Sequence, residues 1–137
     1  TMYCCSDNVT EAQREGFVSL LHCSGLLEEL DEKLMDVGSA VAGCGGAFAC
    51  LFLEGLADGA VYAGLPRVKA QRYAAQMLLG MAKLALASDE HTGALKDAVC
   101  SPGGTTIAGV RALEERGFRA AAMNAVIAAY ERTKELG

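Results

Sequence analysis

Hydrophobic residues recur at intervals of three and four along most of this chain, which is the pattern of helices that bury one face. The pattern is longest over residues 67–87, where alanine, methionine and leucine form one stripe, and it returns over residues 118–136. A third helix is predicted over residues 11–23, and shorter helices are predicted between these three. The chain is therefore expected to be all-α, with alanine- and glycine-rich helices that approach one another closely.

Capping and breaking residues predict where the first helices begin and end. Thr10 and Gln13 form a capping box before the first helix, and Gly25 follows its end. Asp31 is the predicted cap of a second helix, which the glycines at 43–46 interrupt. 

A helix break and a cap predict where the helices of the second half of the chain begin and end. Gly64 and Pro66 separate a central helix from the long methionine-rich one. Thr92 is expected to cap a short helix that ends at Val99.

The first thirty residues are the one part with strand character. Residues 1–5 read as a short strand, and residues 26–30 as a brief extended piece. A lone strand has nothing to pair with among the helices that follow, so we expect it to be the end of the last strand of a missing, preceding domain. This predicts a boundary between a strand remnant at 1–6 and a helical domain at 7–137.

The least polar stretch is residues 37–53, which contain no charged side chain. A membrane span is not expected, because four glycines interrupt the run and it is shorter than the ~20 apolar residues that a span needs. The helix over 47–63 is instead interpreted as the centre of a helical core or of an intimate oligomer. Glu54 and Asp58 lie four residues apart and could serve acid–base work or a metal, but pairing with a neighbouring helix is favoured because the chain has no Glu-x-x-His.

Composition and charge narrow the function classes. The chain has 137 residues, 52% hydrophobic and 21% charged, which suits one globular domain that buries about two-thirds of its unfolded surface. Its net charge is −5 and no basic stripe is present, so neither nucleic acid nor an anionic membrane surface is an expected partner.

The cysteines and histidines predict no metal site. None of the six cysteines forms a Cys-x-x-Cys pair, so we expect reduced, buried thiols in a cytoplasmic protein, with the adjacent Cys4 and Cys5 the pair most open to oxidation. His22 has no Glu or His at ligand spacing, and nothing in the sequence fixes His91 for proton transfer.

The loop at 101–106 carries the most distinctive chemistry. A proline and two glycines at 102–104 stand directly before a helix, for which Thr105 or Thr106 can be the N-cap. The unpaired amides of a first helical turn and the positive end of the helix dipole favour a carboxylate or a phosphate. The same residues also suit a plain turn, and spacing alone leaves both interpretations open.

Residues 95–109 resemble the signature of pyrroline-5-carboxylate reductase, and the motifs at 53–67 and 112–126 are similar to the same family. The resemblance covers about residues 7–137 and implies the family's C-terminal, helical dimerisation domain, whose helices interleave with those of a second copy. The family's nucleotide-binding Rossmann domain, with its Gly-x-Gly-x-x-Gly fingerprint, is expected to be missing, and residues 1–5 would end its last strand.

The resemblance implies an oxidoreductase that reduces the cyclic imine 1-pyrroline-5-carboxylate to L-proline with NADP or NAD as the cofactor. The missing domain would bind that cofactor, so the fragment would be inactive by itself. The fragment would supply the substrate seat and a homodimer interface, with a higher oligomer left open.

The same resemblance implies a set of substrate-binding residues. They are Ser101, Gly103, Gly104, Thr105 and Thr106. The two glycines and Thr105 would donate backbone amides to the substrate carboxylate, and Ser101 and Thr106 would donate hydroxyls. Ser39 would be a polar contact to the substrate ring, and it and Thr106 are the catalytic candidates.

One stretch departs from the family. Residues 42–48 stand where the family commonly has S-G-S-G-P-A-Y, and they lack its two serine hydroxyls. Gly46 replaces the proline, and Phe48 replaces the tyrosine. The helix break is expected to survive, because the glycines do. Two alternatives stay open: a helical oligomerisation module that binds no substrate, and the C-terminal domain of a related imine or hydroxyacid dehydrogenase.

Overall fold

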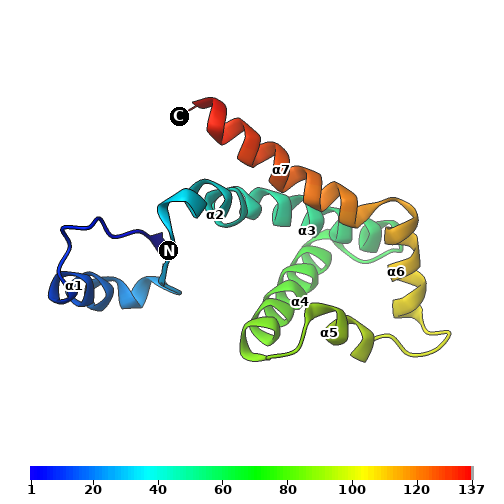
Figure 1. Ribbon diagram of the computed structural model, residues 1–137. Coiled ribbons are helices and arrows are strands. Elements are labelled where there is room, and N and C mark those ends of the chain that lie inside the picture. The colour runs from blue at the N-terminus through cyan, green and yellow to red at the C-terminus, as the bar shows by residue number, and fades with distance from the viewer. Residues whose placement is uncertain (137) are drawn as a thin grey trace. The chain divides into compact units, whose positions relative to one another are not determined.

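A computed structural model describes residues 1–136, which are mainly helical (Figure 1). This confirms the expected fold class. The chain divides into two compact units: Thr1–Gly45 with the segment from Ala125 onward, and Gly46–Asn124. In chain order the elements are β1 (Met2–Tyr3), α1 (Glu11–Leu21), η1 (His22–Ser24), β2 (Glu28–Glu29), η2 (Glu32–Leu34), α2 (Met35–Ala42), α3 (Gly45–Tyr62), α4 (Arg67–Ala87), α5 (Thr92–Ala98), α6 (Thr105–Glu115) and α7 (Phe118–Leu136).

In the first unit, α1 begins at the predicted capping box. The Thr10 hydroxyl accepts a hydrogen bond from the Gln13 amide at 3.4 Å, and the Gln13 side chain accepts one from the Thr10 amide at 2.9 Å. The short 3₁₀ turn η1 extends the helix to Gly25, whose φ of +113° ends it. His22 Nδ1 lies 2.7 Å from the carbonyl oxygen of Ser19, so the His22 ring is hydrogen-bonded to the preceding turn.

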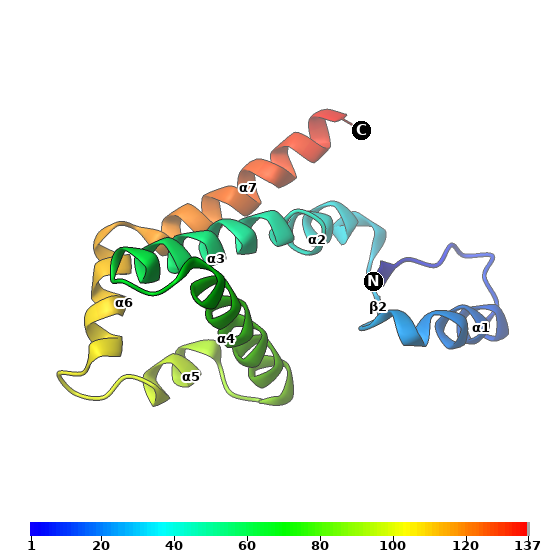
Figure 2. The same cartoon turned by 180° about the vertical axis from the view of Figure 1, so that it is seen from behind.

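The N-terminal strand has a partner inside this chain. β1 and β2 pair in parallel, with Met2 opposite Glu28 and Tyr3 opposite Glu29 (Figure 2). The expectation that a lone strand finds nothing to pair with is therefore wrong, because the extended piece predicted at 26–30 returns beside it. That β1 ends the sheet of a preceding domain stays a prediction.

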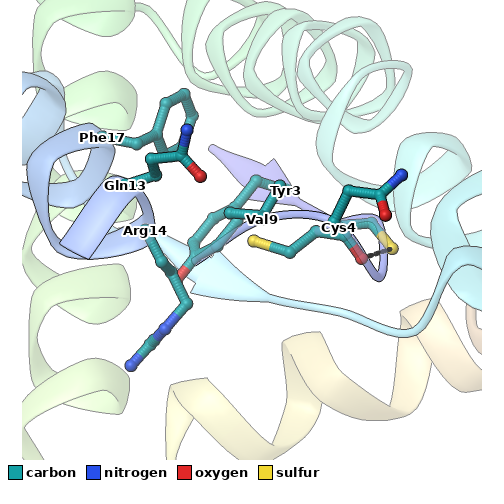
Figure 3. A pocket seen from close by; sticks show the side chains of 8 residues that line it. Tyr3, Cys4, Val9, Gln13, Arg14 and Phe17 are labelled. Atoms are coloured by element: carbon teal, nitrogen blue, oxygen red, sulfur yellow. Dashed lines mark hydrogen bonds between the residues drawn. The ribbon is translucent and has the colours of Figure 1, made fainter. Parts of the chain in front are cut away.

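An open pocket of about 400 Å³ lies beside β1 and α1, and Figure 3 shows the side chains that line it. The rings of Tyr3 and Phe17 are 5.2 Å apart, centroid to centroid. The Arg14 guanidinium pairs with Glu11 and lies 3.3 Å from a carboxylate oxygen of Glu29. The hydrogen bonds from Arg14 hold the pKa of Glu11 below its ordinary value. These contacts tie α1 to both strands.

Asp31 caps the 3₁₀ turn η2, which leads into α2, and α2 itself follows Leu34 with no side-chain cap. The end of α2 follows the sequence prediction. The Asp31 carboxylate accepts a hydrogen bond from the Lys33 amide at 3.1 Å, and hydrogen bonding to Lys33 lowers the pKa of Asp31. α2 ends before the glycines at 43–46, and α3 begins among them. A Cβ at Gly43 would lie 2.9 Å from the carbonyl oxygen of Ser39, so the close approach at this break needs a glycine.

In the second unit, a tight turn joins α3 to α4, the two helices drawn in shades of green in Figure 1. Gly64 has a φ of +100°, and an Arg67 nitrogen donates to the Asp58 carboxylate at 2.5 Å across the turn. The structural role favoured for Asp58 is confirmed. Within residues 1–136, no group of three or more His, Cys, Asp or Glu side chains could hold a metal.

The cap of α5 differs from the predicted one. His91 is the N-cap, and its Nδ1 accepts a hydrogen bond from the Gly93 amide at 3.0 Å. Thr92 is the first helical residue and not the cap. The prediction is wrong by one residue because a histidine ring nitrogen accepts the same hydrogen bond that a threonine oxygen would.

Little of the chain is buried. Its buried hydrophobic residues, among those described, are the four alanines Ala40, Ala57, Ala70 and Ala74. Its accessible surface is 10400 Å², against ~6,800 Å² for a compact monomer of this mass. The single chain therefore buries only about half of its unfolded surface, and the two-thirds expected from its length is wrong for one copy.

Burial of the cysteines and of the central helix is also less than expected. All six cysteines are free, as expected, but Cys4, Cys23, Cys44 and Cys50 are exposed, so the expectation of buried thiols is wrong for the single chain. In α3 only one residue is buried, which excludes the helical-core interpretation for one copy. The helical run Glu32–Tyr62 is long and apolar enough to cross a membrane, by length and composition only, and 11% of its apolar window is buried.

Candidate functional site

The loop at 101–106 is a tight turn that leads directly into α6. The Ser101 carbonyl oxygen accepts a hydrogen bond from the Gly104 amide at 3.0 Å, and Gly103 has a φ of +69°. With Pro102 at the second position, these features define a type II β-turn. Glycine is needed at the third position because side chains disfavour a positive φ there.

Gly104 is the N-cap of α6, with a φ of −77° and a ψ of 171°. The predicted caps are therefore wrong, since Thr105 and Thr106 both lie inside the first helical turn. Gly104 has no side chain that could cap the helix, so the first amides of α6 receive no capping hydrogen bond from it. Both threonines are exposed, which leaves this helix start accessible from solvent.

Ser101 lies close to the same helix start. A Cβ at Gly104 would overlap Ser101 Oγ and would lie 3.1 Å from the Ser101 carbonyl oxygen. A side chain at Gly104 would therefore displace the Ser101 hydroxyl and press on the Ser101 carbonyl oxygen. The turn brings together all five residues predicted for the substrate seat, Ser101, Gly103, Gly104, Thr105 and Thr106. One predicted donor is already in use, because the Gly104 amide donates within the turn.

The start of α6 favours an anion, whereas the nearest basic residue on α5, Lys96, is paired with Asp97. The first turn of α6 has no acidic residue to oppose the positive end of the helix dipole. At the end of α5, Lys96 Nζ lies 2.7 Å from a carboxylate oxygen of Asp97, and this contact raises the pKa of Lys96. Lys96 therefore keeps its positive charge at neutral pH.

Ser39 lies in a different part of the fold from the loop. It is exposed on α2 in the first unit, and its carbonyl oxygen accepts a hydrogen bond from the Gly43 amide at 2.8 Å. The loop at 101–106 belongs to the second unit. The contact between Ser39 and a substrate ring stays a prediction.

Comparison with known families gives the chain a clear assignment. The family model described as "Pyrroline-5-carboxylate reductase dimerisation" matches residues 32–136. The pyrroline-5-carboxylate reductase of Synechocystis sp. is 53% identical over 113 residues, which are 82% of this chain and 42% of the relative. The Escherichia coli protein of the same name is 43% identical over 128 residues, 93% of this chain and 48% of the relative. The chain thus spans about half the length of the curated relatives it matches.

Solved structures agree over almost the whole chain. The Plasmodium falciparum pyrroline carboxylate reductase with NADP bound matches with a TM-score of 0.89 at 36% identity, over 99% of this chain and 52% of that one. A pyrroline-5-carboxylate reductase from Coxiella burnetii matches with a TM-score of 0.92 at 30% identity, over 99% of this chain and 51% of that one. This chain belongs to the pyrroline-5-carboxylate reductase dimerisation family.

Proposed function

We propose that this chain is the substrate-binding and dimerisation part of an enzyme that reduces 1-pyrroline-5-carboxylate to L-proline. The observation that carries the proposal is the helix start at the loop 101–106, where a glycine turn leads into an uncapped, accessible first turn of α6 with no acidic residue. The names of the relatives support the choice of reaction.

In this proposal the substrate carboxylate binds at the start of α6. The amides of Gly103 and Thr105 donate to it, and the hydroxyls of Ser101 and Thr106 add two further donors. The Gly104 amide stays in the turn, where it holds the backbone in place. Backbone amides keep their protons at every physiological pH, so this seat does not depend on the titration of a side chain.

Binding of this kind positions the imine for reduction. NADP or NAD, when bound by another domain, supplies the hydride. The chain's own task is to hold the imine carbon in reach, with Ser39 and Thr106 as polar contacts near the ring. A serine hydroxyl is too weak an acid to protonate the ring nitrogen by itself, so the proposed role of Ser39 is orientation.

The proposal also covers the organisation of the protein. Residues 1–6 end the last strand of the cofactor domain, and residues 7–137 form the helical domain. Two copies assemble into a cytoplasmic homodimer, which is supported by the match to a dimerisation family and by the exposed apolar helices. A small cyclic imino acid is the expected ligand, with no nucleic acid or membrane partner.

Titration of the isotopically labelled chain with L-proline tests the seat by NMR. We expect weak binding that shifts the amides of residues 101–107. Gly104→Ala should weaken this binding, because the added Cβ displaces Ser101. Gly109→Ala is the matched control on the same helix, since a Cβ there has nothing within 4 Å. An absence of shifts at 101–107 at saturating proline would favour a module that only oligomerises.

An assay of NADPH oxidation completes the test. The 137-residue chain should bind the product without reducing 1-pyrroline-5-carboxylate, because the residues proposed here position the substrate and do not hold the hydride donor. Measured turnover by the purified chain would contradict this division of labour.

A further inference from the structure

An open, mainly apolar cavity of about 330 Å³ lies among α5, α6 and the start of α7 in the second unit, and no residue of the loop 101–106 lines it. This volume is at the lower end for small-molecule sites. Its walls combine basic, acidic and apolar groups. Those that matter here are His91, Lys96, Glu114, Arg119, Leu113 and Phe118.

The charges at this cavity balance. Arg119 Nε donates to Glu114 Oε1 at 2.5 Å, and Lys96 Nζ lies 2.7 Å from Asp97 Oδ1. The lining thus holds two cations and one carboxylate, and Asp97, which pairs with Lys96 from outside the lining, brings the local charge to zero. A dianion such as phosphate would need an excess of positive charge that these four groups do not provide, whereas a ligand with no net charge leaves the balance intact.

Both ion pairs leave hydrogen-bonding capacity for a ligand. Within the described chain, the contact of Arg119 with Glu114 runs through Nε, which leaves the two terminal nitrogens as a fork that suits a carboxylate. Lys96 has three donors and places one on Asp97. Lys96 and Arg119 both line the cavity, so a single anion inside it faces both cations.

The remaining groups add a third donor and an apolar wall. His91 Nδ1 accepts the hydrogen bond of the Gly93 amide, so the proton of the neutral ring is on Nε2, which can donate to a ligand. The Phe118 ring lies 5.3 Å from that of Phe52, which fixes its position. Phe118 and Leu113 offer the cavity a partly exposed apolar surface.

We propose that this cavity binds a free α-amino acid with a small apolar side chain, in its zwitterionic form. The carboxylate lies between Lys96 and Arg119, the ammonium group approaches Glu114, and the side chain packs on Leu113 and Phe118. The site is separate from the loop 101–106 and does not rest on the function proposed for it.

An NMR titration of the full chain with L-valine tests the site. Valine should shift the amides of residues 91–96 and 110–119 with an affinity of ~1 mM. Isovalerate lacks the ammonium group and isobutylamine lacks the carboxylate, and each should bind about tenfold more weakly, because each loses a charge-assisted hydrogen bond. Equal affinities for valine and isovalerate, or valine shifts confined to residues 101–107, would overturn the proposal.

Substitutions provide the second arm. Arg119→Gln and Glu114→Gln should each weaken valine binding about tenfold. Arg111→Gln is the matched control, because Arg111 pairs with Glu115 at 3.3 Å and does not line the cavity. Circular dichroism checks that each variant is folded. If a variant does not fold, the comparison of valine, isovalerate and isobutylamine on the unmodified chain still tests the site. Unchanged valine affinity in folded Arg119→Gln would contradict the site.

Discussion

His91 stabilises the start of α5 through its ring, which accepts the hydrogen bond of the Gly93 amide. His91→Ala leaves that amide without a partner and should lower the free energy of unfolding by about 1 kcal/mol. His91→Asn should retain most of this stability, because asparagine is a good N-cap. Thr92→Ala is the control and should change stability by less, since Thr92 is inside the helix. Urea titrations at one protein concentration measure the difference. A larger loss for Thr92→Ala would show that the histidine does not cap.

Cys5 is less exposed than its neighbour Cys4 and lies near a carboxylate. Partial burial and the nearby Glu29 carboxylate raise the pKa of the Cys5 thiol, so at neutral pH less of it is the reactive thiolate. We expect iodoacetamide to modify the exposed Cys4 faster than Cys5, as measured by mass spectrometry. Glu29→Gln should speed the modification of Cys5, and Glu28→Gln, which changes the preceding strand residue, should not. Equal rates at Cys5 in both variants would contradict the role of Glu29.

At the scale of elements, two glycines have opposite effects on stability. Gly64 is needed for its backbone conformation, whereas Gly109 only lowers the helix propensity of α6. Gly64 has a φ of +100° with nothing within 4 Å of an added Cβ, so Gly64→Ala is opposed only by its backbone conformation and should destabilise by about 1 kcal/mol. Gly109 lies inside α6 with equal space, and Gly109→Ala should stabilise by up to about 1 kcal/mol. Denaturant midpoints of the two variants should therefore move in opposite directions. A shift of both in the same direction would contradict this assignment of the turn.

Helix bounds were more predictable than helix caps. The bounds of α4 and α7 agree with the periodicity at 67–87 and 118–136, because long amphipathic stripes average over many residues. The predicted caps of α5 and α6 are wrong because threonine is a common capping residue and stands next to each helix start. In the structure the cap is His91 for α5 and Gly104 for α6. The pairing of β1 with β2 was missed because a two-residue strand has no alternation to read.

The residues of the candidate site could be found from the sequence, but the use of their hydrogen bonds could not. Pro102 and Gly103 predict a turn before a helix, and the turn is present. That the Gly104 amide is consumed inside the turn follows from backbone geometry, which residue types do not specify. The cavity beside Arg119 is lined by residues of three helices, and no local sequence pattern predicts that these helices lie side by side.

At the scale of the whole molecule, periodicity shows that a helix has an apolar face but not what covers that face. In this chain Leu51 of α3 is 69% exposed and Tyr62 is 95% exposed. The accessible surface exceeds that of a compact monomer by ~3,600 Å² per chain, or ~7,200 Å² for a pair, which is above the ~2,000–5,000 Å² that obligate homodimers commonly bury. A second copy is the cover that the dimerisation family suggests.

If the second copy completes the core, folding and association are one process, and stability must depend on protein concentration. A hundredfold increase in concentration should stabilise the folded dimer by about 2.7 kcal/mol, because the unfolded chains are separate. Thermal melts in detergent-free buffer at 1 and 100 µM test this, with light scattering on the same samples to measure the mass. A rise of several degrees together with a dimer mass is the expected result. A melting temperature that does not change with concentration, or a requirement for detergent, would show that something other than a second copy covers α3.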